Sequence, residues 1–185
     1  MKRARGFSLI EVLITLLLTA IGILGIVAMQ SRSIQYTQNS VERNTAIMLT
    51  NELIEIIRVN PDAVFDQTLP NYPINNHLKT DSLFFKSAGE DFETASAECA
   101  SPAAASTAQE LRDCWVAKVK TKLPEADTVF ESDSYICRSS TIGNCDSKGS
   151  ALEIQLAWSA RGEGNCLDEA GTASDICTFS TRVEP

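Results

Sequence analysis

The residues of this sequence that could take part in chemistry form two sets, one at the head of the chain and one of six cysteines. At the head, Glu11 is an isolated carboxylate in an apolar segment, because the twenty residues from Val12 to Ser31 carry no charge. A charged side chain within a bilayer costs about 2.5–3.5 kcal/mol near the centre and less near the ends, so such an acid is a functional candidate by default. Just before it, the Gly6-Phe7 junction separates a basic leader from the apolar stretch. A cut there would remove the basic residues and keep the hydrophobic segment.

The second set consists of six cysteines, an even number, and none of them forms a Cys-x-x-Cys motif. This pattern favours disulfides over a redox pair or a zinc site. Six cysteines allow fifteen complete pairings, and the sequence alone leaves them open. We favour three local bonds, because each would close a short loop rich in Gly, Ser or Ala, and closing a 15-residue loop is worth about 3 kcal/mol. The favoured pairs are Cys99–Cys114, Cys137–Cys145 and Cys166–Cys177.

No other set of residues predicts catalysis. The sequence has no phosphate-binding loop, no Gly-x-Ser-x-Gly and no metalloprotease motif, and its one histidine, His77, lies in a polar Asn-Asn-His loop. With 16 basic and 24 acidic side chains the net charge is −8, which argues against a surface that follows nucleic-acid phosphates. We therefore expect a protein that is not an enzyme, has no cofactor or metal and binds no nucleic acid.

The element that must position Glu11 is a membrane-spanning helix. Twenty uncharged residues at about 1.5 Å each cross the roughly 30 Å hydrocarbon core of a bilayer. A secretory signal would have a shorter apolar core followed by a small-residue cleavage site. The basic residues Lys2, Arg3 and Arg5 precede the span, and basic residues are retained on the cytoplasmic side. We expect a single-pass membrane protein, with a cytoplasmic N-terminus and everything beyond about residue 31 on the far side of the membrane.

The helix should continue past the membrane as far as residue 60, because no proline occurs before Pro61. Apolar residues in its second half recur at helical spacing and predict an amphipathic face that another element covers. These residues are Leu49, Leu53, Ile56 and Ile57, with Val41 and Met48 extending the same side. The expected organisation is a leader at 1–6, a helix at 7–60 and a globular α+β domain at 61–185.

Within that domain a second helix is predicted between a capping box at Thr107 and Glu110 and a stop at Pro124. Its apolar face comprises Ala108, Leu111, Trp115, Val119 and Leu123. The region 61–107 should be largely irregular, with one short strand at 83–85.

The C-terminal third predicts antiparallel strands. Leu152, Ile154, Leu156 and Trp158 alternate with more polar residues, which is typical of a half-buried strand. Residues 129–138 and 176–183 are further strand candidates. The fold expected is α+β, with a long N-terminal helix packed on a small antiparallel sheet that disulfides stabilise.

The string from Arg5 to Val12 resembles the recognition site of the prepilin peptidase, so the chain is similar to the type IV prepilin family, including the pseudopilins of type II secretion. The resemblance implies cleavage between Gly6 and Phe7 and N-methylation of Phe7. It further implies that Glu11 pairs with the amine of a neighbouring subunit during assembly. The resemblance also implies a location in the bacterial inner membrane, with the globular domain in the periplasm. The implied partners are the prepilin peptidase, the major pilin, other minor pilins and inner-membrane lipid.

Three functions remain open within this resemblance. The first is a minor pilin that primes or joins the pilus fibre and supports twitching motility. The second is a minor pseudopilin of a type II secretion system, and the spacing of Gly22 and Gly25 favours the pilus only modestly. The third is a tip adhesin, whose loops at 143–150 and 162–175 would carry recognition.

Overall fold

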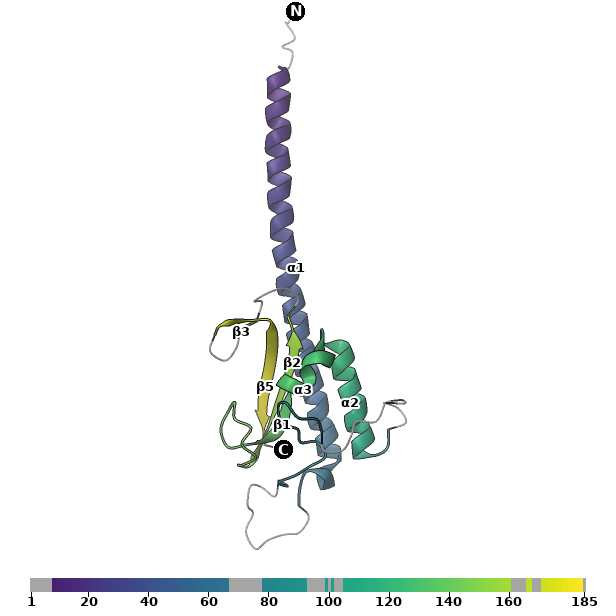
Figure 1. Cartoon of the computed structure of the whole chain (residues 1–185). Helices are drawn as coiled ribbons and strands as arrows, with labels where there is room; N and C mark the ends of the chain where they lie inside the picture. Colours follow the sequence, from purple (N-terminus) through teal and green to yellow (C-terminus); the bar gives the residue numbers. More distant parts are fainter. Residues whose placement is uncertain are drawn as a thin grey trace, which may run out of the picture. The chain divides into compact units, whose positions relative to one another are not determined.

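The computed structural model (Figure 1) describes most of the chain. The described residues are 8–66, 78–92, 99, 101, 105–160, 166–167 and 171–184. The leader at 1–6, the Gly6-Phe7 junction and His77 lie outside them, so the sequence expectations for these residues stay predictions.

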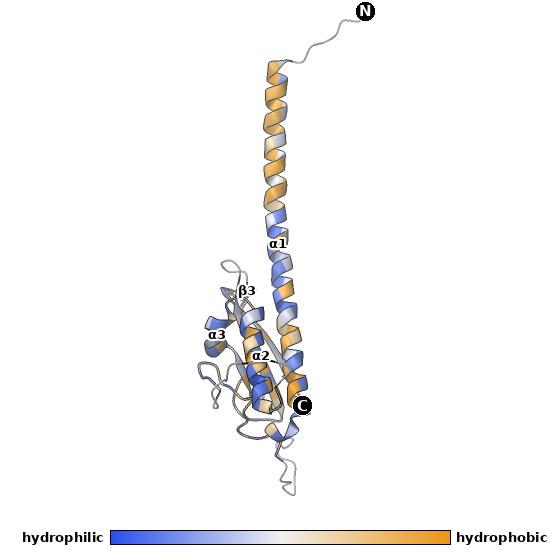
Figure 2. Ribbon diagram, turned by 90° about the vertical axis from the view of Figure 1, so that its right-hand side faces the viewer, coloured by the Kyte–Doolittle hydropathy of each residue, from blue (hydrophilic) through white to orange (hydrophobic). Residues whose placement is uncertain are grey.

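The chain divides into two compact units, Met1–Ser40 and Val41–Pro185, and we call the second the folded domain. Helix α1, Leu9–Val59, contributes to both. From Leu9 to Met29 its side chains are almost continuously apolar, which is the orange part of α1 in Figure 2. This helix is long and apolar enough to cross a membrane, with a mean hydropathy of 2.7 in its most apolar window and no burial of that window.

In the folded domain α1 presents one buried face, and it differs in part from the predicted one. Val41 and Met48 are 58% and 71% exposed, so their assignment to the buried face was wrong. The buried face is rotated about the helix axis relative to the predicted one, and it includes two polar residues. Glu42 and Thr50 each lie four residues from Ala46, so the helix repeat places all three on the same side. The buried residues are Glu42, Ala46, Leu49, Thr50, Leu53, Ile54 and Ile57.

The end of α1 follows from Asn60-Pro61. The Asn60 side-chain amide donates to the Ile56 carbonyl at 2.8 Å and so satisfies one of the last helical acceptors. Pro61 then begins a short 3₁₀ helix, η1, at Pro61–Ala63. A proline cannot continue the α-helical hydrogen bonds, which explains the change of helix type.

Helix α2, Ala108–Lys122, begins and ends as the sequence predicted. Thr107 accepts a hydrogen bond from the Glu110 backbone and Glu110 accepts one from the Thr107 backbone, which completes the capping box. The Trp115 indole N–H donates to the Leu49 carbonyl of α1 at 2.8 Å. This bond satisfies the polar atom of a buried tryptophan and fixes α2 against α1.

Helix α3, Ala126–Asp133, lies where the sequence predicted the start of a strand. Only the end of the predicted 129–138 strand is extended, as β1, Tyr135–Ser139. Ala126 and Phe130 lie four residues apart on one helical face, and their packing in the core outweighs the strand-forming pattern of the segment.

The main sheet has the order β1-β2-β5 and is antiparallel throughout (Figure 1). Strand β2 is Ala151–Ser159 and β5 is Ile176–Val183, the latter with the predicted bounds. A second, two-stranded sheet pairs β3, Cys166–Leu167, with β4, Ala173–Ser174. The fold class is the predicted one, a long helix with a small antiparallel sheet.

Strand β2 is more buried than the alternating pattern predicted. Leu152, Ile154 and Leu156 face the core, but Glu153 and Ala157 on the other face are buried as well. The strand is central in the sheet, and the β1–β2 loop folds over Glu153, so the half-buried interpretation was wrong.

The predicted strand at 83–85 is a turn, closed by a hydrogen bond from the Phe85 N–H to the Ser82 carbonyl. Extended pairing occurs one residue later, where Lys86 and Ile136 exchange backbone hydrogen bonds of 2.8 Å in both directions. The apolar pair Phe84-Phe85 therefore marks a buried turn next to the edge of β1.

Candidate processing and assembly site

The head of α1 carries the assembly candidate. The helix begins at Leu9, and Glu11 lies in its first turn. The Ser8 carbonyl accepts from the Glu11 N–H at 3.0 Å and from the Val12 N–H at 3.3 Å. A carboxylate in the first turn is favoured by the positive end of the helix dipole, so this position tolerates the charge better than a mid-helix one.

Two other polar side chains of the apolar segment are satisfied within their own helix. The Thr15 hydroxyl donates to the Val12 carbonyl at 2.9 Å, and the Thr19 hydroxyl donates to the Thr15 carbonyl at 2.7 Å. Both bonds remove the need for water or for a partner inside an apolar medium. Glu11 differs, because within the described residues no side chain pairs with its carboxylate. It is therefore the one acid in this segment that can attract a cation from outside the chain.

The six cysteines form three disulfides, and these are the pairs that the sequence favoured. Their Cα–Cα distances are 4.6, 5.6 and 5.1 Å, within the usual range for disulfides. Cys99–Cys114 attaches the chain before α2 to that helix. Cys137–Cys145 closes the β1–β2 loop, and Cys166–Cys177 joins β3 to β5. The cysteines thus fix loops to the sheet and to α2, and none is free among the described residues.

Metal binding finds no support in the described part of the chain, where no group of three or more potential ligands lies together. Both tryptophans, Trp115 in α2 and Trp158 in β2, are buried in the core.

Several buried charges were missed by sequence reasoning. Arg112 is fully buried and pairs with its neighbour Asp113 at 2.6 Å, while also donating to the Leu83 carbonyl at 2.7 Å. Arg138 is buried in β1, and Glu153 is buried in β2. In the sequence, a charged residue among apolar ones is interpreted as solvent-exposed. The structure shows that loops cover these residues.

Lys86 is a further buried charge, and its burial changes its pKa. Its ammonium donates to three backbone carbonyls, those of Ser87, Glu131 and Ser134, at 3.0, 2.8 and 2.9 Å. Desolvation by burial lowers the pKa of Lys86 from 10.5 to about 8. Nearby carboxylates oppose this shift, and Asp91 has the largest opposing effect. The residue joins the end of α3 to the edge of β1, which is a structural task.

Two family models match the chain. The prokaryotic N-terminal methylation motif matches residues 1–27, and the type IV pilin Tt1218 model, Tt1218-like, matches residues 28–115. Neither the comparison with curated proteins nor that with solved structures gave a match. The two family matches adjoin, and together they cover the leader junction, Glu11, the whole of α1 and the first half of α2.

Proposed function

We propose that this chain is a minor pilin. Its two family matches assign it to the type IV pilins, which are structural proteins and not enzymes. Its task would be to prime the assembly of the pilus fibre or to join that fibre. The observation that carries the proposal is Glu11, an acid at the head of an apolar helix that pairs with no side chain of the described residues and lies within the match to the N-terminal methylation motif.

In the proposed sequence of events, the prepilin peptidase cuts between Gly6 and Phe7. The new amine of Phe7 is methylated and keeps its positive charge. Glu11 of one subunit then pairs with the amine of its neighbour inside the membrane, where an unpaired carboxylate is costly. The apolar side chains of α1, which are exposed in the single chain, become covered by neighbouring helices.

The finer assignment rests on similarities to the minor pilin PilV. The Ala-Ile-Gly-Ile-Leu-Gly segment at 20–25 looks like the corresponding part of PilV, and so does the helix from Ala108 that leads to Trp115. The Leu123-Pro124 stop and the Leu156-Ala157-Trp158 stretch of β2 add to the resemblance. The six-cysteine count departs from the general family pattern, so the loops are not transferred.

The proposed location follows the same logic. Before assembly the chain would be anchored in the inner membrane, with its N-terminus cytoplasmic and its folded domain periplasmic. Afterwards it would lie in the fibre, at its base or at its tip. Its partners would be the prepilin peptidase, the major pilin, other minor pilins and inner-membrane lipid.

Deletion of the gene tests the proposal. We expect surface pili and twitching to fall sharply while the major pilin still accumulates in the membrane, and blocking fibre retraction should restore some fibres if the chain primes assembly. Normal piliation with failed export of secreted enzymes would instead identify a pseudopilin. Normal piliation with lost attachment would identify an adhesin.

A matched pair of variants tests the role of Glu11. Glu11→Ala should leave membrane insertion and the three disulfides intact but sharply reduce recovery of the chain in sheared fibres. Thr15→Ala is the control, because the Thr15 hydroxyl is satisfied inside its own helix. Incorporation of Glu11→Ala at the wild-type level would refute the charge pair.

A further inference from the structure

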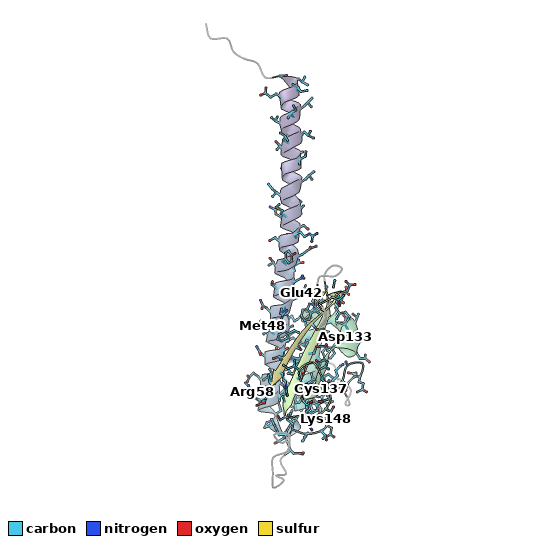
Figure 3. The ribbon with its side chains drawn as sticks, turned by 90° about the vertical axis from the view of Figure 1, so that its left-hand side faces the viewer. Glu42, Met48, Arg58, Asp133, Cys137 and Lys148 are labelled. Atoms are coloured by element: carbon cyan, nitrogen blue, oxygen red, sulfur yellow. A yellow bond between two sulfur atoms is a disulfide. The ribbon has the colours of Figure 1, made fainter. Side chains whose placement is uncertain are left out.

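Beyond the leader, the first compact unit carries two charged side chains, Glu11 and Arg32. Arg32 is the first charge after the apolar run, and the next one along the chain is Glu42. Figure 3 shows the side chains of α1 between its head and the labelled Glu42 pointing outward from the helix. Arg32 is exposed, and no side chain of the described residues pairs with its guanidinium. This cation is therefore open to a partner from outside the chain.

The spacing of the two charges matches the thickness of a bilayer. Both lie on the continuous helix α1, and Arg32 follows Glu11 by 21 residues. At about 1.5 Å per residue this separation is roughly 31 Å, whereas the hydrocarbon core of a bilayer is about 30 Å thick. When Glu11 lies at one boundary of that core, Arg32 lies at the other, where the phosphate groups of the lipids begin. In the proposed topology this boundary belongs to the periplasmic leaflet.

The residues beside Arg32 change along the helix in the order in which a bilayer changes. They line one shallow groove on a single face of α1, because they recur four residues apart. Met29, 77% exposed, lies on the apolar side of Arg32, and Tyr36, 69% exposed, lies one turn beyond it. The rise from Arg32 to Tyr36 is about 6 Å, close to the roughly 5–7 Å depth of one headgroup layer. Tyrosine is itself enriched at this depth.

The chemistry of Arg32 suits a phosphate group. A guanidinium is planar and stays protonated, and it can donate to two oxygens of one phosphate at the same time. Its long apolar stem can follow the helix surface while the charged end stays at the polar boundary. A phosphodiester at the boundary of the hydrocarbon core is therefore a geometric as well as an electrostatic partner for this side chain.

The groove offers nothing that would repel a phosphate. The described residues that line it include no acid, and the hydroxyls of Ser33 and Thr37 lie on the same face as Arg32. The chain as a whole carries a net charge of −8, so an anionic membrane surface repels most of it. Beyond the leader, Arg32 is therefore the group of the first unit that an anionic lipid attracts.

We propose that Arg32 and Tyr36 form a binding site for the headgroup phosphate of an anionic phospholipid in the periplasmic leaflet of the inner membrane. The guanidinium donates to the phosphate oxygens, the Tyr36 hydroxyl lies among the headgroups, and Met29 contacts the upper part of the acyl chains. Bound in this way, the helix is held at a fixed depth until assembly removes it from the bilayer. This inference rests on the proposed function, because it takes the chain to be anchored in the inner membrane before it joins a fibre.

The direct test uses the full chain, purified in detergent and reconstituted into phosphatidylcholine vesicles. The vesicles contain a trace of either a photoreactive phosphatidylglycerol or a photoreactive phosphatidylcholine, with the reactive group at the same place next to the headgroup. Mass spectrometry locates the cross-links along the chain. We expect the anionic lipid to label residues 28–40 about fivefold more than the zwitterionic one, the usual effect of one basic side chain at an anionic membrane surface.

Substitutions give the second readout. Arg32→Gln should remove this preference, so that both lipids label residues 28–40 equally. Arg43→Gln is the matched control and should keep the preference, because Arg43 is exposed on the same helix but lies in the folded domain and outside the groove. Each variant must be recovered in the membrane fraction with all three disulfides formed. Arg32 lies outside the folded domain, so its substitution should leave the disulfides intact.

Equal labelling of the wild type by the two lipids would overturn the proposal, and this comparison does not depend on the behaviour of any variant. A preference that persists in Arg32→Gln would overturn it too, because another group would then bind the lipid. Both results would leave the minor-pilin proposal standing, since the lipid test needs no fibre. If deletion of the gene leaves piliation normal, the proposed function fails, and the labelling still reports independently whether the anchored chain binds the lipid.

Discussion

At the scale of single residues, Lys86 shows how burial and hydrogen bonding act against each other. Three carbonyls accept from its ammonium, yet removal from water lowers its pKa to about 8. A neutral amine would keep part of these bonds without the desolvation cost. The protonation state of Lys86 therefore affects how strongly the end of α3 is held against the edge of β1.

The consequence for stability has a definite sign. Between pH 8 and 10.5 the unfolded chain, with an ordinary lysine pKa, binds more protons than the folded domain, so the Lys86 contribution to stability rises with pH in this range. Below pH 8 both states are protonated and the contribution is constant. Chemical denaturation of wild type and Lys86→Met from pH 7 to 9.5 measures it. The wild type should gain stability relative to the variant as the pH rises, and parallel curves would contradict the assignment.

Gly149 gives a second prediction at this scale. Its φ is +82°, and an added Cβ would lie 2.6 Å from the Ser139 carbonyl oxygen, a backbone atom that cannot move aside cheaply. Gly89, at φ +80°, has open space at the same point. Gly89→Ala should cost about 1–2 kcal/mol for the left-handed backbone alone. Gly149→Ala should cost clearly more, as measured by urea denaturation, and equal losses would show that the loop can shift.

At the scale of elements, α2 depends on its N-terminal cap. Thr107→Ala should destabilise the folded domain by about 1 kcal/mol, the usual cost of removing a capping hydroxyl. The backbone N–H groups of Ser106 and Thr107 lower the pKa of Glu110. The ionised Glu110 carboxylate therefore stabilises the folded domain above the ordinary pKa of 4.5, and this stabilisation is lost as the pH falls. Glu110→Gln should flatten the acid side of the stability curve relative to Glu125→Gln, which alters an acid that makes no side-chain capping bond. Identical acid profiles for the two variants would argue against the capping role.

Elements with strong local signals were predictable from the sequence, and those defined by their neighbours were not. The capping box and Pro124 delimit α2, which was found, and the strand candidate at 176–183 has the bounds of β5. The short helix α3 is defined by Ala126 and Phe130 packing on the core, a spacing that also fits a strand. Glu153 was read as solvent-facing because the loop that covers it is specified by residues ten positions away.

The candidate site was predictable for the same reason. Glu11 is anomalous in its own local context, since it interrupts an uncharged run, and no tertiary information is needed to notice it. Ile142 is ordinary in the sequence, because an isoleucine beside a glycine reads as a strand end. Its exposed position depends on the groups that hold the β1–β2 loop in place, which are the Cys137–Cys145 disulfide, the Glu153 carboxylate and the Arg182 guanidinium.

At the scale of the whole molecule, the proposed processing predicts a specific mature chain. Cleavage after Gly6 and methylation of Phe7 should give an intact mass that lacks Met1 to Gly6 and carries one added methyl group. Mass spectrometry of the membrane-extracted protein checks this, with a peptidase-deficient strain as the control that retains the leader. A mature chain that still carries Lys2 and Arg3 would contradict the processing.

The order of the disulfides has a consequence for biosynthesis. The cysteines pair first with second, third with fourth and fifth with sixth, with separations of 15, 8 and 11 residues. In the proposed topology the N-terminus stays cytoplasmic and the folded domain crosses the membrane with its N-terminal end first. Each cysteine then emerges directly before its partner, so an oxidase that joins every cysteine to the next one to emerge makes only native bonds. We expect loss of the periplasmic dithiol oxidase to abolish accumulation of the protein, whereas loss of a disulfide isomerase should leave its yield unchanged. Fidelity would then come from timing along the chain and not from later correction.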